Sequence, residues 1–189
     1  IMGRLNYTLM NRYFLTLSIR RDGYSAFGME NPYATFPSGA LAWNLSDESF
    51  FNIKWINNLK VRASYGINGN RDIGIYDALA KLETNKYLTG STLISGIYSS
   101  SLANQYLKWE KTKALNLGLD FSILNSRLNG SVDYYSMITN DLLLKRSLPT
   151  IIGYDNVMSN MGELQNKGFE MTLNSSVSYT HLTLPTSDL

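Results

Sequence analysis

The chain has 189 residues, of which 44% are hydrophobic and 17% charged, and its formal net charge is +2 at pH 7. That charge is too small to favour a nucleic-acid partner, and no run approaches the ~18 consecutive apolar residues of a membrane helix. Cysteine is absent, which excludes disulfides and thiolate metal sites, while 13 tyrosines dominate an aromatic content of 12%.

The N-terminal region predicts three strands. Apolar and polar residues alternate in Leu5–Leu9 and again in Tyr13–Ile19, with only Met-Asn-Arg between them, so we expect a tight hairpin. The polar stretch Arg21–Phe36 contains Gly and Pro and is expected to be a long connection, and a third strand follows at Pro37–Leu45. Ser46 is the expected cap of a single helical turn.

The fourth strand has the clearest pattern. Between Leu59 and Ile67 every odd position is apolar or aromatic, and the even positions read Lys, Arg, Ser and Gly. This period of two predicts a strand with one apolar and one polar face, and the following Asn-Gly-Asn is expected to lead it into a loop. The loop, Asn68–Lys113, is the longest connection that the sequence predicts.

The C-terminal half repeats the alternation. Strands are expected at Leu115–Phe121 and Leu128–Tyr134, joined by the short turn Leu124–Ser126. A connection at Asn140–Glu163 then leads to a last strand at Lys167–Leu173. The sequence therefore predicts seven strands whose connections alternate between short and long.

This alternation of connections favours an all-β, antiparallel, up-and-down transmembrane β-barrel, of which about seven strands are present. Short turns at one edge and long loops at the other are typical of outer-membrane barrels, in which lipid faces the apolar parity and the lumen the polar parity. The alternative is a soluble or surface-attached β-sandwich binding module, which uses the same alternation to bury one face. Tyr and Trp near strand ends, and Lys and Arg on the polar parity, favour the membrane.

The last residues read differently from the rest. Val177–Thr186 is VSYTHLTLPT, which matches one translated frame of a sequencing-library adaptor, so we expect a barrel segment at 1–176 and a non-native tail at 177–189. The single histidine, His181, lies in this tail. Without a native His or Cys, no catalytic, metal or cofactor site is expected, and an enzyme is not favoured.

Six motifs in order carry a family resemblance: RRDG, FPSGALAW, LKVRASYGINGN, LKWEKTKALNLGLDF, RLNGSVDYYSMITNDLLL and NKGFEMTLN. In this order and spacing the chain resembles the barrel of SusC/RagA-type TonB-dependent outer-membrane transporters. The motif residues are interpreted as architectural, fixing turns and interfacial anchors. They are Leu59, Arg62, Ser64, Tyr65, Gly66, Gly69, Asn70, Trp109, Glu110, Asn166, Lys167, Gly168 and Glu170.

The resemblance implies a plugged barrel of about 22 strands in the bacterial outer membrane. It also implies coupling to the TonB complex through an N-terminal region, a SusD-like lipoprotein lid as partner, and import of a large nutrient such as an oligosaccharide or a peptide. Aromatic residues of the long loop are the candidate substrate-facing groups, because aromatic rings stack on sugar faces. They are Tyr76, Tyr87, Tyr98, Tyr106 and Trp109.

Overall fold

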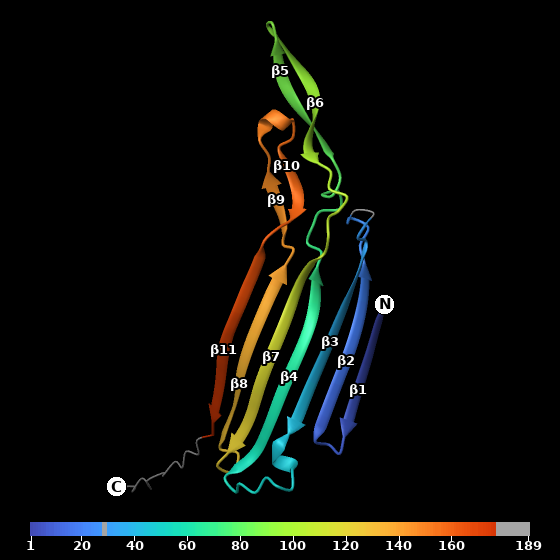
Figure 1. Ribbon diagram of the computed structural model, residues 1–189. Helices are drawn as coiled ribbons and strands as arrows, with labels where there is room; N and C mark the ends of the chain where they lie inside the picture. The colour runs from blue at the N-terminus through green and yellow to red at the C-terminus, as the bar shows by residue number, and fades with distance from the viewer. Residues whose placement is uncertain (28–29, 177–189) are drawn as a thin grey trace, which may run out of the picture.

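A seven-stranded antiparallel sheet, here called the wall sheet, forms most of the protein (Figure 1). The computed structural model describes residues 1–27 and 30–176. The wall sheet has the order β1-β2-β3-β4-β7-β8-β11, and each neighbouring pair is antiparallel. Its strands are β1 (Met2–Leu9), β2 (Tyr13–Gly23), β3 (Tyr33–Asn44), β4 (Ile56–Asn70), β7 (Glu110–Ile123), β8 (Leu128–Asn140) and β11 (Glu163–Ser175).

Successive connections lie at opposite ends of the wall sheet, as the sequence predicts. The β1–β2, β3–β4 and β7–β8 links lie at one end, the short-turn end, and the others gather at the opposite, long-loop end (Figure 1). The predicted sorting by length fails at one place, because the β3–β4 link, 45–55, is longer than the β2–β3 connection, 24–32. The β3–β4 link contains the 3-10 turn η1 (Leu45–Asp47), which is preceded by Asn44 without a side-chain capping bond. The prediction that Ser46 caps this turn is wrong, because Ser46 lies inside it.

A second, four-stranded sheet was not predicted; we call it the loop sheet. It has the order β5-β6-β10-β9 and is built within the two longest connections. Its strands are β5 (Lys81–Thr89), β6 (Thr92–Leu102), β9 (Leu143–Ser147) and β10 (Asn156–Asn160), with the 3-10 turn η2 (Thr150–Ile152) between β9 and β10. The β5–β6 hairpin projects away from the wall sheet beyond the long-loop end (Figure 1).

The predicted connection at Arg21–Phe36 is shorter in the structure, because β2 continues to Gly23 and β3 begins at Tyr33. Cross-strand contacts explain the extension. The guanidinium of Arg20 lies 5.5 Å from the centroid of the Phe36 ring, its register partner, and that of Arg21 lies 5.2 Å from the Tyr33 ring. Cation–π contacts of this kind pair the strands beyond the region of simple alternation.

The two faces of the wall sheet differ in chemistry along whole rows. One row across the seven strands is Tyr7, Leu15, Leu41, Ala63, Leu117, Tyr134 and Phe169. The next row, on the opposite face, is Asn6, Thr16, Ala40, Ser64, Asn116, Tyr135 and Gly168. Each strand therefore presents its apolar parity to the same side.

The apolar face is uncovered within residues 1–27 and 30–176, where Leu41 is 60% and Phe169 67% exposed. A sandwich would bury such a face against a second sheet, so the structure does not support the soluble-sandwich alternative. No helix in the described part of the chain is long and apolar enough to cross a membrane.

The polar face carries an ion-pair cluster across three strands. Arg62 of β4 donates two hydrogen bonds of 2.8 Å to Asp120 of β7 and one of 2.9 Å to Asp133 of β8. Gly118 lies between them, and a Cβ there would come within 2.5 Å of Oδ1 of Asp133 and 2.8 Å of Cζ of Arg62. The absent side chain leaves the space over β7 that the guanidinium occupies, and a larger residue here would require the Arg62 and Asp133 side chains to shift.

Candidate functional site

The buried core lies at the long-loop end of the wall sheet, not in its middle. It gathers side chains from the β2–β3, β4–β5 and β6–β7 connections and from β3. The ring of Trp109 lies 4.9 Å from that of Phe27 and 5.7 Å from that of Phe36, centroid to centroid. Leu107 and Ile73 complete the packing. These contacts tie three long connections into one base, from which the loop sheet projects.

Trp109 belongs to this core. It is 3% exposed, so the structure corrects the expectation that its ring faces outward like the loop tyrosines. Its burial agrees with the architectural interpretation of Trp109 as a motif residue. The substrate-facing expectation failed because the aromatic partners, Phe27 and Phe36, come from a different connection and a different strand. A Trp directly before the alternating strand β7 is the one signal of an anchor that the sequence offers.

The motif glycine Gly69 has a packing role in the same core. A Cβ at this position would lie 2.0 Å from Cζ and 2.4 Å from Cε1 of Phe36. The Phe36 ring therefore rests directly on the backbone of Gly69, which answers why the Asn-Gly-Asn segment requires a glycine at its centre.

Two other motif residues, Asn70 and Glu110, meet in space. The amide of Asn70 donates to Oε1 of Glu110 at 3.1 Å, and Oε2 of Glu110 accepts from the backbone N–H of Leu143 at 3.2 Å. The side chain of Asn160 adds bonds to the backbone carbonyls of Lys108 (2.8 Å) and Asp141 (2.9 Å). These bonds hold the adjoining ends of β4, β7, β9 and β10 together, which supports the architectural interpretation of Asn70 and Glu110.

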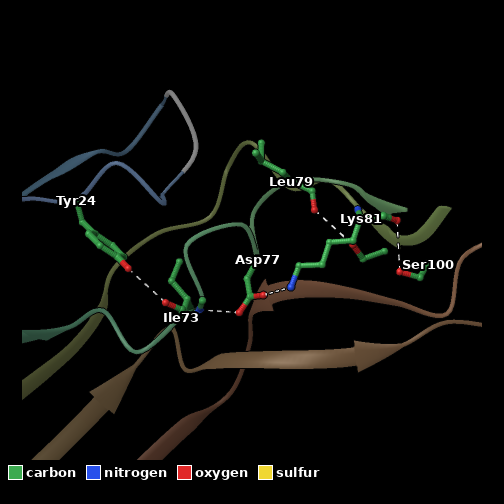
Figure 2. A network of polar contacts seen from close by, with 8 residues as sticks. Tyr24, Ile73, Asp77, Leu79, Lys81 and Ser100 are labelled. Atoms are coloured by element: carbon green, nitrogen blue, oxygen red, sulfur yellow. Dashed lines mark hydrogen bonds and ion pairs between the residues drawn. The ribbon is translucent and has the colours of Figure 1, made fainter. Parts of the chain in front are cut away.

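The loop between β4 and β5 is fixed by the pair Asp77 and Lys81, whose side chains point toward each other in Figure 2. Oδ1 of Asp77 lies 2.5 Å from Nζ of Lys81, and Oδ2 accepts from the backbone N–H of Gly74 at 2.7 Å. The Lys81 hydrogen bond is the main cause that lowers the pKa of Asp77 below its ordinary value, with the Gly74 bond adding to it. The carboxylate therefore stays ionised and holds the loop closed.

Two buried serines join this loop to β6. The Ser101 hydroxyl accepts from the backbone N–H of Lys81 at 2.9 Å and lies 3.3 Å from the carbonyl of Leu79, and the Ser100 hydroxyl donates to the carbonyl of Lys81 (Figure 2). A small polar hollow beside them is also lined by Glu83, Lys145 and Asn156. These bonds tie the base of the β5–β6 hairpin to the β4–β5 loop.

The remaining candidate tyrosines are spread over this assembly. Tyr76 and Tyr106 lie in the links before β5 and before β7 and are 66% and 72% exposed. Tyr87 and Tyr98 lie on one face of the β5–β6 hairpin, because Glu83, the register partner of Tyr98, has the same parity on β5 as Tyr87. In the described residues no ring contact joins any two of these four tyrosines.

The two hairpin tyrosines differ in their freedom. Tyr98 donates a hydrogen bond of 3.1 Å to Asp155, and this bond is the main cause that raises the pKa of its phenol above the ordinary value. Tyr87 is 54% exposed, and its ring lies over Gly96, where a Cβ would come within 2.8 Å of Cε1. One face of the Tyr87 ring is thus supported by the hairpin, while the ring as a whole remains accessible.

Within residues 1–27 and 30–176 no group of three or more His, Cys, Asp or Glu side chains could hold a metal ion. The arrangement is instead that of a scaffold. A sheet with one apolar and one polar face, short turns at one end and a rigid loop assembly at the other, defines the wall of a membrane-spanning β-barrel of the outer-membrane class.

The family follows from comparison with known proteins. The family model "TonB dependent receptor-like, beta-barrel" matches residues 1–188. This chain belongs to the TonB-dependent receptor family and forms part of its β-barrel, which lies in the outer membrane. It is 44% identical over 176 residues to TonB-dependent receptor P3 of Formosa agariphila and 39% identical over 180 residues to TonB-dependent receptor SusC of Bacteroides thetaiotaomicron.

Solved structures agree with this assignment. A chain of the RagAB peptide transporter superposes with a TM-score of 0.82 at 30% identity, over 94% of this chain. The siderophore receptor PirA of Pseudomonas aeruginosa, at 16% identity and a TM-score of 0.56, shares the fold alone. The chain spans 18% of the length of P3 and of SusC and 19% of the RagAB chain, so it corresponds to about a fifth of these relatives. The SusC/RagA resemblance of the motifs is confirmed.

Proposed function

We propose that the full-length protein carrying this segment is an active transporter that imports a large nutrient, an oligosaccharide or a peptide, across the outer membrane. Support comes from the SusC and RagAB relatives, the second of which is named as a peptide transporter. In this proposal the TonB complex supplies the energy through a region outside this chain, and a SusD-like lipoprotein covers the long-loop end. The segment itself has a transport role and no catalytic one.

The observation that carries the proposal is the division of the wall sheet into two faces below a rigid loop assembly. The apolar face meets lipid, and the polar face, with Arg62, Asp120 and Asp133, lines the interior of the barrel. The loop assembly rises from the end at which outer-membrane barrels carry their extracellular loops. A substrate arriving from outside would meet this assembly before it meets the polar face.

Within the loop assembly, the tyrosines with accessible rings are the proposed contacts for substrate. Tyr76, Tyr87 and Tyr106 are all more than half exposed, and an aromatic ring offers a flat apolar surface to a sugar or to a peptide side chain. Tyr98 keeps a role in the same proposal, although its hydroxyl is bound to Asp155. The proposal omits Trp109, because its ring is enclosed by the core.

Binding and uptake by the full-length protein test this function. A glycan array and a peptide library identify the ligand, and calorimetry then measures its affinity for wild type, Tyr87→Ala and Tyr106→Ala. Each loop variant is expected to bind about 5–10-fold more weakly, since an aromatic contact contributes about 1–1.5 kcal/mol. The matched control is Tyr134→Ala, which removes a ring from the lipid-facing row and should leave affinity unchanged.

Uptake of the same ligand, labelled, should also stop when TonB is deleted. Failure of the full-length protein to bind any glycan or peptide, or uptake that is independent of TonB, would contradict the proposed function. Unchanged affinity in both loop variants would contradict the tyrosine assignment alone.

A further inference from the structure

An apolar groove crosses the lipid-facing side of β1, β2, β3 and β4. Its volume is about 410 Å³, which lies within the ~300–1,000 Å³ typical of small-molecule pockets. It is lined by apolar side chains, among them Leu9, Leu15, Leu41, Trp43, Val61 and Ala63. Ala63 stands in a row of larger residues, between Leu41 and Leu117, and this small side chain leaves the space that the groove occupies.

The groove lies at the short-turn end of the wall. Leu9 is the last residue of β1, and Trp43 precedes the last residue of β3, so the groove begins where these strands turn and runs inward along them. Short turns of outer-membrane barrels face the periplasm. The groove therefore opens on the hydrocarbon of the periplasmic leaflet, and it is continuous with the apolar face of β4 and β7.

Its rim is polar and fixed. Glu48, in the β3–β4 link, accepts hydrogen bonds from Tyr13 at 2.6 Å and from Trp43 at 3.0 Å, and its other oxygen accepts from Arg12 at 3.2 Å. The Tyr13 and Trp43 rings stack 5.9 Å apart, centroid to centroid. Aromatic residues with their polar atoms bound at the membrane interface form a rigid wall, and the partly exposed guanidinium of Arg12 lies at its edge.

We propose that this groove is a binding site for one phospholipid of the periplasmic leaflet. One acyl chain lies in the groove against Ala63 and Val61, held by the Trp43 ring, and the headgroup phosphate lies against Arg12. The apolar lining matches hydrocarbon, and the guanidinium at the rim matches a phosphate in charge and geometry. The bound lipid would then brace β1, β2 and β3 at the membrane interface. This role is separate from substrate import.

The test compares Val61→Phe with Val132→Phe in the full-length receptor. Both valines lie in one lipid-facing row, but only Val61 lines the groove. The receptor is extracted in mild detergent and the phospholipids that remain bound are counted by native mass spectrometry. A second variant, Ala63→Leu, fills the groove from its floor, and Arg12→Gln is compared with Arg127→Gln at another short turn.

Wild type, Val132→Phe and Arg127→Gln are expected to retain the phospholipid, whereas Val61→Phe and Ala63→Leu lose it and Arg12→Gln retains less. Heat-modifiable migration on gels confirms that each variant has assembled. Equal retention by the Val61 and Val132 variants would overturn the proposal. Retention of lipopolysaccharide in place of phospholipid would also overturn it. A third contradicting result is a receptor dimer that dissociates in the groove variants while the amount of bound lipid stays the same.

Discussion

Leu117→Arg tests the orientation of the wall sheet. Leu117 lies near the middle of β7, in the apolar row between Ala63 of β4 and Tyr134 of β8, and its side chain is partly exposed on that face. If lipid covers this face, the substitution places a cation close to the bilayer midplane. The neighbouring position Asn116 faces the polar side, between Ser64 and Tyr135, and provides a control at the same depth.

The expected cost of Leu117→Arg is about 2–4 kcal/mol, the range for a cation at the midplane of a barrel wall. For Asn116→Arg it is about 0.5 kcal/mol or less, because the side chain enters a hydrated interior. At 1.4 kcal/mol per factor of ten, the folding constants of the two variants should differ about tenfold or more. The assay is reversible urea unfolding of the full-length receptor in lipid vesicles, followed by gel migration. Equal destabilisation at both positions would refute the assignment of the two faces.

Three further outcomes are expected. Gly69→Ala should cost about 1–3 kcal/mol in the same urea assay, because its methyl group displaces the Phe36 ring, while Gly3→Ala should be near neutral, because the nearest atom to its methyl group, Cγ2 of Ile19, is 3.8 Å away. Hydrogen bonding, chiefly from Tyr13, lowers the pKa of Glu48, so its stabilising effect is complete above the ordinary carboxyl pKa and disappears as pH falls through the lowered value. The difference in unfolding midpoint between wild type and Glu48→Gln should therefore shrink in acid, and a difference that is constant with pH would contradict this. The segment expressed alone should need detergent to stay in solution, because both edge strands and the apolar face are uncovered; a monodisperse monomer in plain buffer by analytical ultracentrifugation would contradict the membrane assignment.

The seven strands of the wall sheet could be predicted because their environment is two-sided. Lipid on one face and a polar interior on the other impose the alternation seen at Leu59–Ile67, and the same pattern recurs in each wall strand. The β5–β6 hairpin has exposed residues along most of both strands, so no period of two marks it. Its turn did leave a signal, since Gly90-Ser91 between two threonines is a typical two-residue hairpin turn, and Gly90 has a positive φ of 62°.

The candidate site was predictable in outline only. Residue type identified exposed tyrosines in the long loop, and Tyr76 and Tyr106 are indeed exposed. The burial of Trp109 depends on Phe27, which is far away in sequence, and no local pattern reports such a contact. The adaptor-like tail at 177–189 lies outside the described residues and stays a prediction, which resequencing of the gene would test.

The most direct test of the membrane-wall account is a scan of oxygen accessibility along β7. The segment contains no cysteine, so a nitroxide can be attached at single cysteines placed in turn from position 114 to 120 of the full-length receptor in a bilayer, with any cysteine elsewhere replaced. Collision with oxygen, which concentrates in hydrocarbon, should rise and fall with a period of two residues and be greatest at Leu115, Leu117 and Leu119. A uniform profile, or maxima at Asn116 and Gly118, would contradict the account.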